Sequence, residues 1–410
     1  MNDHAAVLPH DVAALGRKLG EALRLCADEL AAAVTTDVPF RIEDVLKEIN
    51  ATSRFLEVHL GALGAQLVRR RPICTSDEWA AIMLPSNILA SGIRTITELL
   101  IGGNKVLVRM TGRASHTSAV VQNLFDDIVP GRVIMERTRT GPDFLDHVMM
   151  SESVRFALVF GGEELGDDLL RRVRQGVTKK VVFEGPGKDP VIVLAGAQID
   201  DVAQVTAKAK LAVAGQRCIA PENVIAHHTV HDELVERLVT AFEAATVGSV
   251  ISPKVPEMVR RQLADAQEKG ARIACGGTIE GQHVAATIVT NATQDMSVFQ
   301  DETFAPLLAV ASFGEPEEAV NIARSSRFGL ACSIFGDEAE AVATELRGEP
   351  YAHRVDDLVF GRYGHVTVNS GLPAAAVRTP FGGYGKSGWI WENGELRQGP
   401  KLPAFEATRM

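Results

Sequence analysis

The sequence predicts an α/β protein with a doubly wound, Rossmann-type domain followed by a second α/β domain. From Trp79 onward, short apolar runs alternate with amphipathic stretches, a pattern typical of parallel strands joined by helical crossovers. Glycines follow some of these runs, as they do where a strand turns into a helix at a phosphate-binding site. With 410 residues, of which 46% are hydrophobic and 23% charged, the chain is long enough for two or three domains.

Each element follows from its local pattern. Apolar residues at helical spacing predict one helix over 11–35, with Asp11 as its N-cap, and a second over about 42–67. In the first α/β unit we expect strands at 80–84, 106–108, 133–135, 156–160 and 180–183, and helices at 92–100, after Ser115, near Asp143 and after Gly166. In the second unit we expect a helix at 203–213 and strands at 191–194, 224–227, 307–312 and 366–369.

The composition argues for a small-molecule partner. A formal net charge of −10 would repel nucleic acid and anionic membranes. No uncharged apolar run reaches the roughly 18 residues of a spanning helix, and the N-terminus shows no basic region followed by an apolar stretch. The five cysteines form no CxxC pair, which favours a reducing compartment. We therefore expect a cytoplasmic protein.

Three histidines lie within five residues, at positions 227, 228 and 231. A metal site would need a second group of Cys, His or carboxylate ligands, and the sequence shows none that completes the set. The alternative is a strand end that turns into a helix beginning at Asp232-Glu233. We favour this alternative and expect no metal.

Six motifs follow one another along the chain. They are Leu84-Pro85-Ser86-Asn87, Gly161 to Gly166, Phe183-Glu184-Gly185-Pro186-Gly187-Lys188, Gly215-Gln216-Arg217-Cys218, Glu302-Thr303-Phe304-Ala305-Pro306 and Pro380-Phe381-Gly382-Gly383. Together, from about residue 12 to the end, they resemble the aldehyde dehydrogenase superfamily. The resemblance implies a cofactor-binding domain at 1–66 and 82–185 and a catalytic domain at 186–385. It also implies bridging or oligomerisation segments at 67–81 and 398–410, which are shortened here, so a homodimer stays an open question.

The resemblance implies a catalytic role for three residues. Cys218 would be the nucleophile, because hydride leaves readily only from a carbon that bears an oxyanion, and a thiolate addition creates one. The Asn87 amide and the Cys218 N–H would stabilise that oxyanion, and Glu184 would be the base for thioester hydrolysis. The alternatives are that Cys218 is a small buried hydrophobe, that Asn87 is a turn residue and that Glu184 caps a helix.

The cofactor would be NAD or NADP. The resemblance places a cofactor at residues Leu84, Pro85, Ser86, Arg109, Thr111, Gly161, Gly162, Gly166, Glu302 and Phe304. Relatives usually have Lys-Pro-Ser-Glu where this chain has Arg109-Met110-Thr111-Gly112, and their Glu binds the adenosine ribose. Loss of that carboxylate beside an arginine favours the 2′-phosphate of NADP. The alternative for the glycines is that they serve turn geometry alone.

Other departures surround the cofactor and the proton path. Ser86 stands where relatives usually have Trp, Phe160 where they have Thr, and Pro186 where they have Gly. Ile96 stands where many relatives have a Lys that pairs near the base. These departures keep two rival hypotheses open. One is a CoA-acylating enzyme, which commonly lacks the base, and the other is a non-redox thioester hydrolase or binding scaffold on the same fold.

The substrate pocket would be wide. The resemblance places its walls at Gly92, Thr95, Arg217, Ala375 and Phe381, where Gly92 and Ala375 are small. We therefore expect an aldehyde bulkier than acetaldehyde, with a polar or anionic group that reaches Arg217 or Arg378. The alternative is that Trp389 or Trp391 folds back to fill the space.

Overall fold

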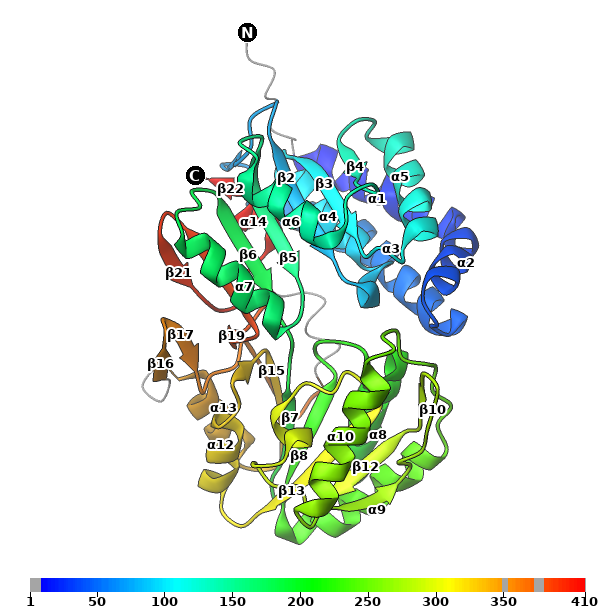
Figure 1. The fold of residues 1–410 in the computed structure, drawn as a ribbon, viewed down its shortest axis with the longest axis vertical. Helices are drawn as coiled ribbons and strands as arrows, with labels where there is room; N and C mark the ends of the chain where they lie inside the picture. Colours follow the sequence, from blue (N-terminus) through cyan, green and yellow to red (C-terminus); the bar gives the residue numbers. More distant parts are fainter. Residues whose placement is uncertain (1–8, 349–352, 372–379, 410) are drawn as a thin grey trace. The chain divides into compact units, whose positions relative to one another are not determined.

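The computed structural model describes residues 9–348, 353–371 and 380–409. The chain forms two compact units, drawn in Figure 1. Unit 1 comprises residues 1–184, 390–395 and 401–410, and unit 2 comprises residues 185–389 and 396–400. The C-terminal segment therefore returns to the N-terminal unit.

Unit 1 begins with three helices, α1 (Pro9–Leu25), α2 (Ala27–Asp37) and α3 (Ile42–Gln66). The helix expected over 11–35 is thus two helices that break at Cys26, and Asp11 lies inside the first turn of α1 rather than at its N-cap. Helix α1 approaches α3 closely, because a Cβ on Gly16 would lie 2.3 Å from the Leu56 carbonyl oxygen. Asp37 at the end of α2 then accepts hydrogen bonds from Thr117 N and Oγ1, which caps helix α5.

The sheet of unit 1 has the strand order β21-β20-β6-β5-β2-β3-β4, and β6 through β4 run parallel. Its strands are β2 (Trp79–Leu84), β3 (Lys105–Met110), β4 (Val133–Met135), β5 (Val154–Phe160), β6 (Lys180–Glu184), β20 (Gly388–Glu392) and β21 (Glu395–Arg397). The helices between them are α4 (Gly92–Ile101), α5 (Ser115–Ile128), α6 (Gly141–Met150) and α7 (Glu163–Arg174). The chain order reverses between β2 and β5. In doubly wound sheets, ligands bind at the carboxyl edge beside such a reversal.

The C-terminal strands in red lie beside β6 in Figure 1. Further along, Phe405 and Thr408 are bound by Arg70, whose Nε donates to Thr408 Oγ1 (2.6 Å) and whose guanidinium lies 5.0 Å from the Phe405 ring centroid. Strand β22 (Thr408–Arg409) pairs with β1 (Arg71–Pro72), and helix α14 (Pro403–Glu406) packs against α4. Trp391 belongs to this sheet and donates from Nε1 to the Val177 carbonyl, just before β6.

Unit 2 has a sheet of order β18-β15-β7-β8-β13-β12-β9, in which only β9 runs antiparallel. Its strands are β7 (Asp189–Val193), β8 (Pro221–His227), β9 (Arg272–Cys275), β12 (Thr287–Thr290), β13 (Leu307–Phe313), β15 (Ala331–Phe335) and β18 (His365–Val368). Successive residues face opposite sides. Along β7, Ile192 joins one apolar cluster while Val191 and Val193 join the other, so both faces are buried, as parallel sheets require.

Helices cover both faces of this sheet. They are α8 (Ile199–Leu211), η2 (Ala212–Gly215), α9 (His228–Glu243), α10 (Val255–Glu268), α11 (Ser297–Gln300), α12 (Pro316–Arg324) and α13 (Ala339–Arg347). Three short ribbons complete the unit: β10 (Ile279–Glu280) with β11 (His283–Val284), β14 (Phe328–Gly329) with β19 (Tyr384–Gly385), and β16 (His353–Val355) with β17 (Leu358–Phe360). Across the described ranges of both units, no helix combines the length and apolar character of a bilayer-spanning segment.

Candidate active site

In unit 1, the predicted residues gather at the carboxyl edge of the parallel sheet. Pro85, Ser86 and Asn87 follow β2, Thr111 follows β3, and Gly161 and Gly162 follow β5. Asn87 lies in the short helix η1 (Ser86–Ile88) and is 9% exposed. Leu84 is buried at the end of β2, where its Cδ1 would lie 2.7 Å from a Cβ on Gly92. Gly92 therefore serves close packing of α4 on β2.

The glycines before and within α7 have different roles. A Cβ on Gly166 would lie 2.5 Å from the Phe183 ring, so this glycine lets α7 approach β6. Gly162 is the N-cap of α7, and a Cβ there would meet nothing within 4 Å. The first-turn N–H groups of α7 suit a pyrophosphate, whereas Glu163 and Glu164 in the same turn add negative charge.

Arg109 is 8% exposed and already has backbone acceptors. Its Nε donates to the Arg139 carbonyl (2.9 Å), and its Nη1 donates to the Met110 carbonyl. Its Nη2 would lie 3.7 Å from a Cβ on Gly112, the position where relatives have the ribose-binding Glu. Glu136, after β4, binds Thr138 and Arg139, and these contacts lower the pKa of its carboxyl to about 2 despite burial. The part of the sheet edge expected to bind adenosine thus holds charges of both signs.

Glu184 is the last residue of β6 and is 5% exposed. Its Oε1 lies 3.1 Å from Lys401 Nζ, and its Oε2 makes no hydrogen bond to any described residue. Burial raises the pKa of Glu184 to about 7, an effect that Lys401 opposes. A carboxyl group of this pKa can accept a proton near neutral pH, as a general base must.

In unit 2, Cys218 follows a strained turn. Val213 and Ala214 both have left-handed backbone angles (φ 52° and 53°), which cost free energy in residues other than glycine. Gly215 follows with φ +74°, and a Cβ there would lie 2.2 Å from the Ala305 carbonyl oxygen. Gln216 holds the turn, since its Nε2 donates to the Val213 carbonyl (3.0 Å) and its Oε1 accepts from Ile251 N (2.7 Å). The glycine and the glutamine therefore fix the backbone before the thiol.

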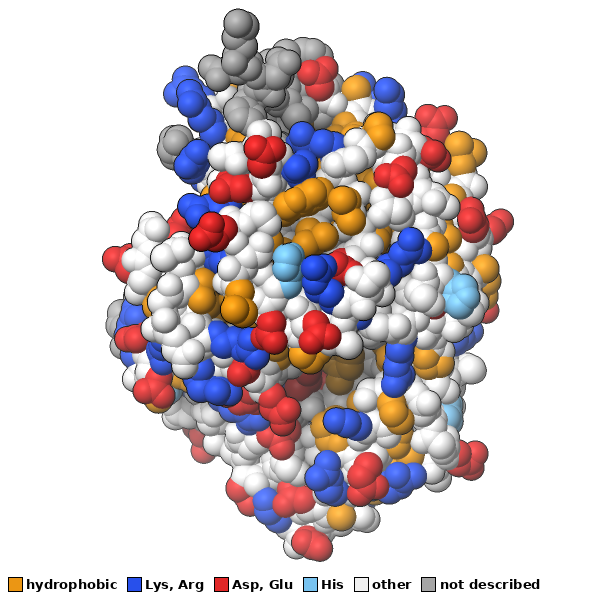
Figure 2. Space-filling view, turned by 45° about the horizontal axis from the view of Figure 1, so that its top comes forward, with side chains coloured by type: hydrophobic (Ala, Val, Ile, Leu, Met, Phe, Trp, Pro, Cys, Tyr) orange, Lys and Arg blue, Asp and Glu red, His pale blue; other side chains and the backbone are white. Residues whose placement is uncertain are grey.

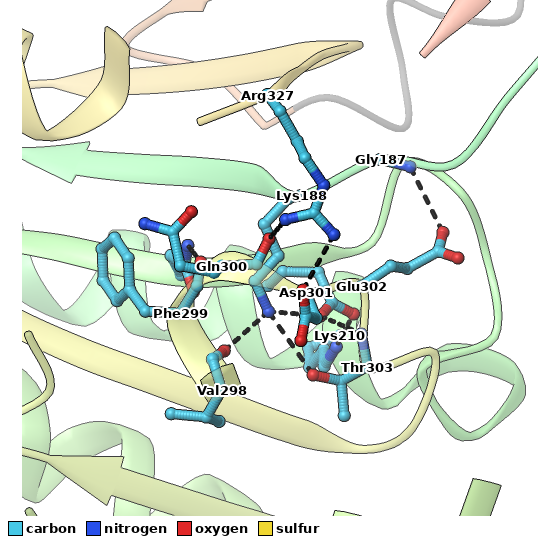
Figure 3. A network of polar contacts seen from close by, with 12 residues as sticks. Gly187, Lys188, Lys210, Val298, Phe299, Gln300, Asp301, Glu302, Thr303 and Arg327 are labelled. Carbon is cyan, nitrogen blue, oxygen red and sulfur yellow. Dashed lines mark hydrogen bonds and ion pairs between the residues drawn. The ribbon is translucent and has the colours of Figure 1, made fainter. Parts of the chain in front are cut away.

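A second loop packs against the cysteine backbone. A Cβ on Gly187 would lie 2.0 Å from the Cys218 carbonyl oxygen, so only glycine fits there. Gly187 N also donates to Glu302 Oε1 (3.2 Å), as Figure 3 shows. One glycine thus contacts both the cysteine loop and the predicted ribose-binding carboxylate. Glu302 is half-buried, and desolvation, together with Glu222, raises its pKa to about 8.

A buried charge network lies beneath the Glu302 loop. Glu222 accepts from Lys188 Nζ (2.9 Å) and Lys210 Nζ (2.6 Å), and its Oε2 also accepts from Thr303 N (2.9 Å). Figure 3 shows both lysines next to Thr303. Phe304, which follows, has φ +52°, an uncommon conformation for a bulky residue. The sequence motifs assign no role to Lys188, Lys210 or Glu222, although Lys188 is the last residue of the Phe183–Lys188 motif.

The Cys218 loop lies at the amino edge of the unit 2 sheet, because it precedes β8 and Gly187 precedes β7. Phe381 lies at the same edge, with its ring centroid 5.4 Å from that of His365, the first residue of β18. Arg217 is half-buried beside Cys218, and Thr95 is half-buried on α4 of unit 1. Ala375 and Arg378 lie outside the described residues.

The remaining cysteines differ from Cys218, which is half-buried. Cys74, Cys275 and Cys332 are buried, and burial raises the pKa of each thiol, that of Cys74 to about 12. Burial also raises the thiol pKa of the half-buried Cys26. A thiol with a raised pKa is a poor nucleophile at neutral pH.

The histidines 227, 228 and 231 lie where β8 turns into α9, which begins at His228. The helix therefore starts four residues earlier than expected. His227 Nδ1 accepts from Thr229 N and caps the helix. Within the described parts of the chain, no group of His, Cys, Asp and Glu has the arrangement of a metal site.

A hollow of about 670 Å³ lies at the opposite, amino edge of the unit 1 sheet. Charged side chains line it, but Arg172 already binds Asp146 and Asp168, and Lys179 donates to the Val148 and Ser151 carbonyls. We do not assign the candidate site to this hollow. Figure 2 shows Lys and Arg interspersed with Asp and Glu across the visible face, which provides no single-sign surface for nucleic acid.

The chain is similar to known proteins along most of its length. Residues 3–398 match the aldehyde dehydrogenase family. A succinate-semialdehyde dehydrogenase [NADP(+)] from Deinococcus radiodurans is 26% identical over 402 residues, covering 92% of this chain and 81% of the relative. A vanillin dehydrogenase from Corynebacterium glutamicum is 28% identical over 302 residues, covering 68% of this chain and 62% of the relative. The chain thus spans less than two thirds of the second protein.

Solved structures confirm the fold. A succinate-semialdehyde dehydrogenase from Burkholderia pseudomallei superposes with a TM-score of 0.85 at 23% identity, covering 98% of this chain and 84% of the other. An aldehyde dehydrogenase from Brucella melitensis gives a TM-score of 0.84, also at 23% identity, covering 99% and 85%. The chain belongs to the aldehyde dehydrogenase family. It is an oxidoreductase of that family, whose members use NAD or NADP.

Proposed function

We propose that this protein oxidises an aldehyde to the carboxylic acid with NAD(P), through a thioester on Cys218 that water hydrolyses. The observation that favours this most directly is how tightly the backbone around Cys218 is held. Gly187 and Gly215 lie where a Cβ would clash with a backbone carbonyl oxygen, and Gln216 holds the turn before Cys218 by two hydrogen bonds. A backbone held this tightly is expected where a nucleophile must be positioned in advance.

Each protein group has one task in this reaction. The Cys218 thiolate adds to the aldehyde carbonyl and gives a thiohemiacetal oxyanion, which the Asn87 amide and the Cys218 N–H stabilise. NAD(P), when bound, accepts the hydride. Glu184 then accepts a proton from water as the water attacks the thioester, and the acid leaves Cys218 as thiolate. The roles of Asn87 and Glu184 follow the family resemblance, and the pKa of Glu184 near 7 suits its role.

The cofactor would use the groups that the sequence motifs predict. The first-turn N–H groups of α7 after Gly162 would bind the pyrophosphate, and Glu302 would accept from the nicotinamide ribose. We propose NADP rather than NAD, because Arg109 Nη2 lies beside Gly112, where the ribose-binding carboxylate is missing. A lower KM for NADP than for NAD supports this choice. An Arg109→Gln variant that leaves the ratio of the two KM values unchanged refutes the role of the arginine.

The substrate we propose is an aldehyde bulkier than acetaldehyde. The relatives include proteins named for succinate semialdehyde, salicylaldehyde and vanillin, all larger than acetaldehyde. Trp391, one of the two side chains that could instead fill the pocket, belongs to the unit 1 sheet, where its Nε1 donates to the Val177 carbonyl. In a series of lengthening aldehydes, each useful methylene should add roughly 1 kcal/mol to transition-state binding. A preference for acetaldehyde would contradict this proposal.

The decisive experiment compares Glu184→Gln with the wild-type enzyme by rapid mixing. We expect the variant to give one burst of reduced cofactor and then to stall, with an acyl group on Cys218 detected by mass spectrometry. Unimpaired steady-state turnover would remove Glu184 from the mechanism.

One observation favours a second function. Glu163 and Glu164 place two carboxylates in the α7 turn expected to bind pyrophosphate, and these would repel that anion. This favours a non-redox thioester hydrolase or binding scaffold. Titration by nicotinamide fluorescence separates the two, since saturable binding supports the dehydrogenase and its absence supports the scaffold.

A further inference from the structure

The C-terminal segment places a lysine against Glu184. Lys401 precedes α14 by two residues, and its side chain is 1% exposed. Its Nζ lies 3.1 Å from Glu184 Oε1 and makes no hydrogen bond to any described residue. Both partners lie in unit 1, although they are 217 positions apart in sequence.

This lysine differs from the other buried lysines in making no hydrogen bond to a described residue, since even Lys210, with one carboxylate partner, donates to it (2.6 Å). Lys179 donates to two carbonyls, Lys180 pairs with Glu392 (3.3 Å) and Glu406 (2.6 Å), and Lys188 has a carboxylate and a carbonyl. Among the described residues, Lys401 contacts one carboxylate, that of Glu184, as an ion pair. A buried ammonium group with a single partner costs free energy that several hydrogen bonds would otherwise offset. An arrangement this costly for folding points to a role in the action of its partner.

The charges around Glu184 leave Lys401 as the group that acts on it. On the neighbouring strand β5, Phe160 lies opposite Glu184. Glu392 of β20 and Glu406 of α14 bind Lys180, at the other end of β6. Lys180 lies four positions before Glu184 along the strand, a distance of roughly 13 Å. The contact also binds only one carboxylate oxygen, and Oε2 accepts from no described residue.

We propose that Lys401 is a positioning residue that keeps Glu184 ionised and holds its Oε1, so that Oε2 is the oxygen that accepts the proton from water. This inference rests on the proposed role of Glu184 as the base. An ammonium group within 4 Å lowers the pKa of a carboxyl group by about 1–3. Without Lys401, burial alone would act on Glu184, and the base would become protonated at neutral pH.

The test uses 4-nitrophenyl acetate, an activated ester that acylates a thiolate without any cofactor. The thiolate attacks the ester carbonyl and releases 4-nitrophenolate, and water then hydrolyses the thioester while Glu184 accepts its proton. The burst of nitrophenolate reports acylation of Cys218, and the steady state reports deacylation. Both are measured between pH 5.5 and 9.5 for the wild type and for Lys401→Met, Lys401→Arg, Lys180→Met and Glu184→Gln.

We expect the acidic limb of deacylation in Lys401→Met to move upward by at least about one pH unit, with the burst rate within about twofold of wild type. Lys401→Arg should restore the limb, because it returns the charge. Lys180→Met should leave the limb in place, since that lysine serves the other end of β6. If Lys401→Met fails to fold by circular dichroism, Lys401→Gln and Lys401→Arg provide the same comparison.

Two failures are distinguishable. If Glu184→Gln deacylates at the wild-type rate, the proposed base is wrong and this inference falls with it. If Glu184→Gln stalls but the limb of Lys401→Met stays where the wild-type limb lies, only the role of Lys401 is refuted. A limb that moves equally in Lys180→Met would also refute it, because the effect would then be general to the C-terminal segment.

Discussion

The network of Lys188, Lys210 and Glu222 should make Glu222→Gln one of the more damaging isosteric changes in unit 2. Both lysine side chains are 0% exposed, and Glu222 is 3% exposed. Glutamine keeps the shape of the side chain and an acceptor for Thr303 N, so the variant removes mainly the charge. Two buried ammonium groups then lose their counter-ion, which costs about 3–5 kcal/mol.

Lys210→Met is the informative comparison. It leaves one lysine, Lys188, against one carboxylate, so the remaining pair is neutral, and the loss of one charged hydrogen bond costs at most about 3 kcal/mol. Lys269→Met is the surface control, because Lys269 pairs with Asp265 at 2.8 Å on a partly exposed site, where water screens the attraction. We expect the loss of unfolding free energy to be largest in Glu222→Gln, smaller in Lys210→Met and smallest in Lys269→Met.

Urea unfolding, monitored by circular dichroism, measures the stability of each variant. Hydrogen exchange of peptides from 298–313 shows where the structure is loosened. Faster exchange at Thr303 in Glu222→Gln, but not in Lys269→Met, would show that the network holds the Glu302 loop. A Glu222→Gln variant as stable as Lys269→Met would refute the reasoning, since it would mean that the two lysines are not desolvated.

Three further predictions follow from single sites. Gly187→Ala should abolish activity, because its Cβ would lie 2.0 Å from the Cys218 carbonyl oxygen, whereas Gly314→Ala, with its closest contact at 3.5 Å, should retain it in the same assay. Iodoacetamide should label Cys218 before Cys74, whose pKa is raised to about 12, and peptide mass spectrometry that finds the reverse order would contradict the assignment. The folded state raises the pKa of Glu184 from 4.5 to about 7, so it binds that proton more tightly than the unfolded state does. The free energy of unfolding should therefore fall by about 3 kcal/mol as pH rises from 4.5 to about 7. Urea midpoints of Glu184→Gln, measured over the same pH range, should lack this fall.

Much of the fold could be predicted from the sequence, because its determinants are local. The unbroken apolar run Val191, Ile192 and Val193 marks a strand buried on both faces, and the structure places successive residues on opposite sides of the unit 2 sheet. Helix boundaries were less accurate. The first predicted helix breaks at Cys26, and α9 begins at His228, before Asp232, because His227 caps it.

Of the candidate site, the sequence determined which residue types stand in which order, and the motif glycines at 187 and 215 lie where the backbone admits no side chain. The tertiary structure alone decided the partners of the buried charges. Ile96 left no lysine where many relatives have one near the base, and Lys401, far along the chain, supplies an ammonium to Glu184. Glu222 of β8 likewise meets Lys188, which lies just before β7. Local patterns specify whether a side chain is buried, but its ion-pair partner depends on where the rest of the chain passes, because Coulomb attraction acts through space and not along the sequence.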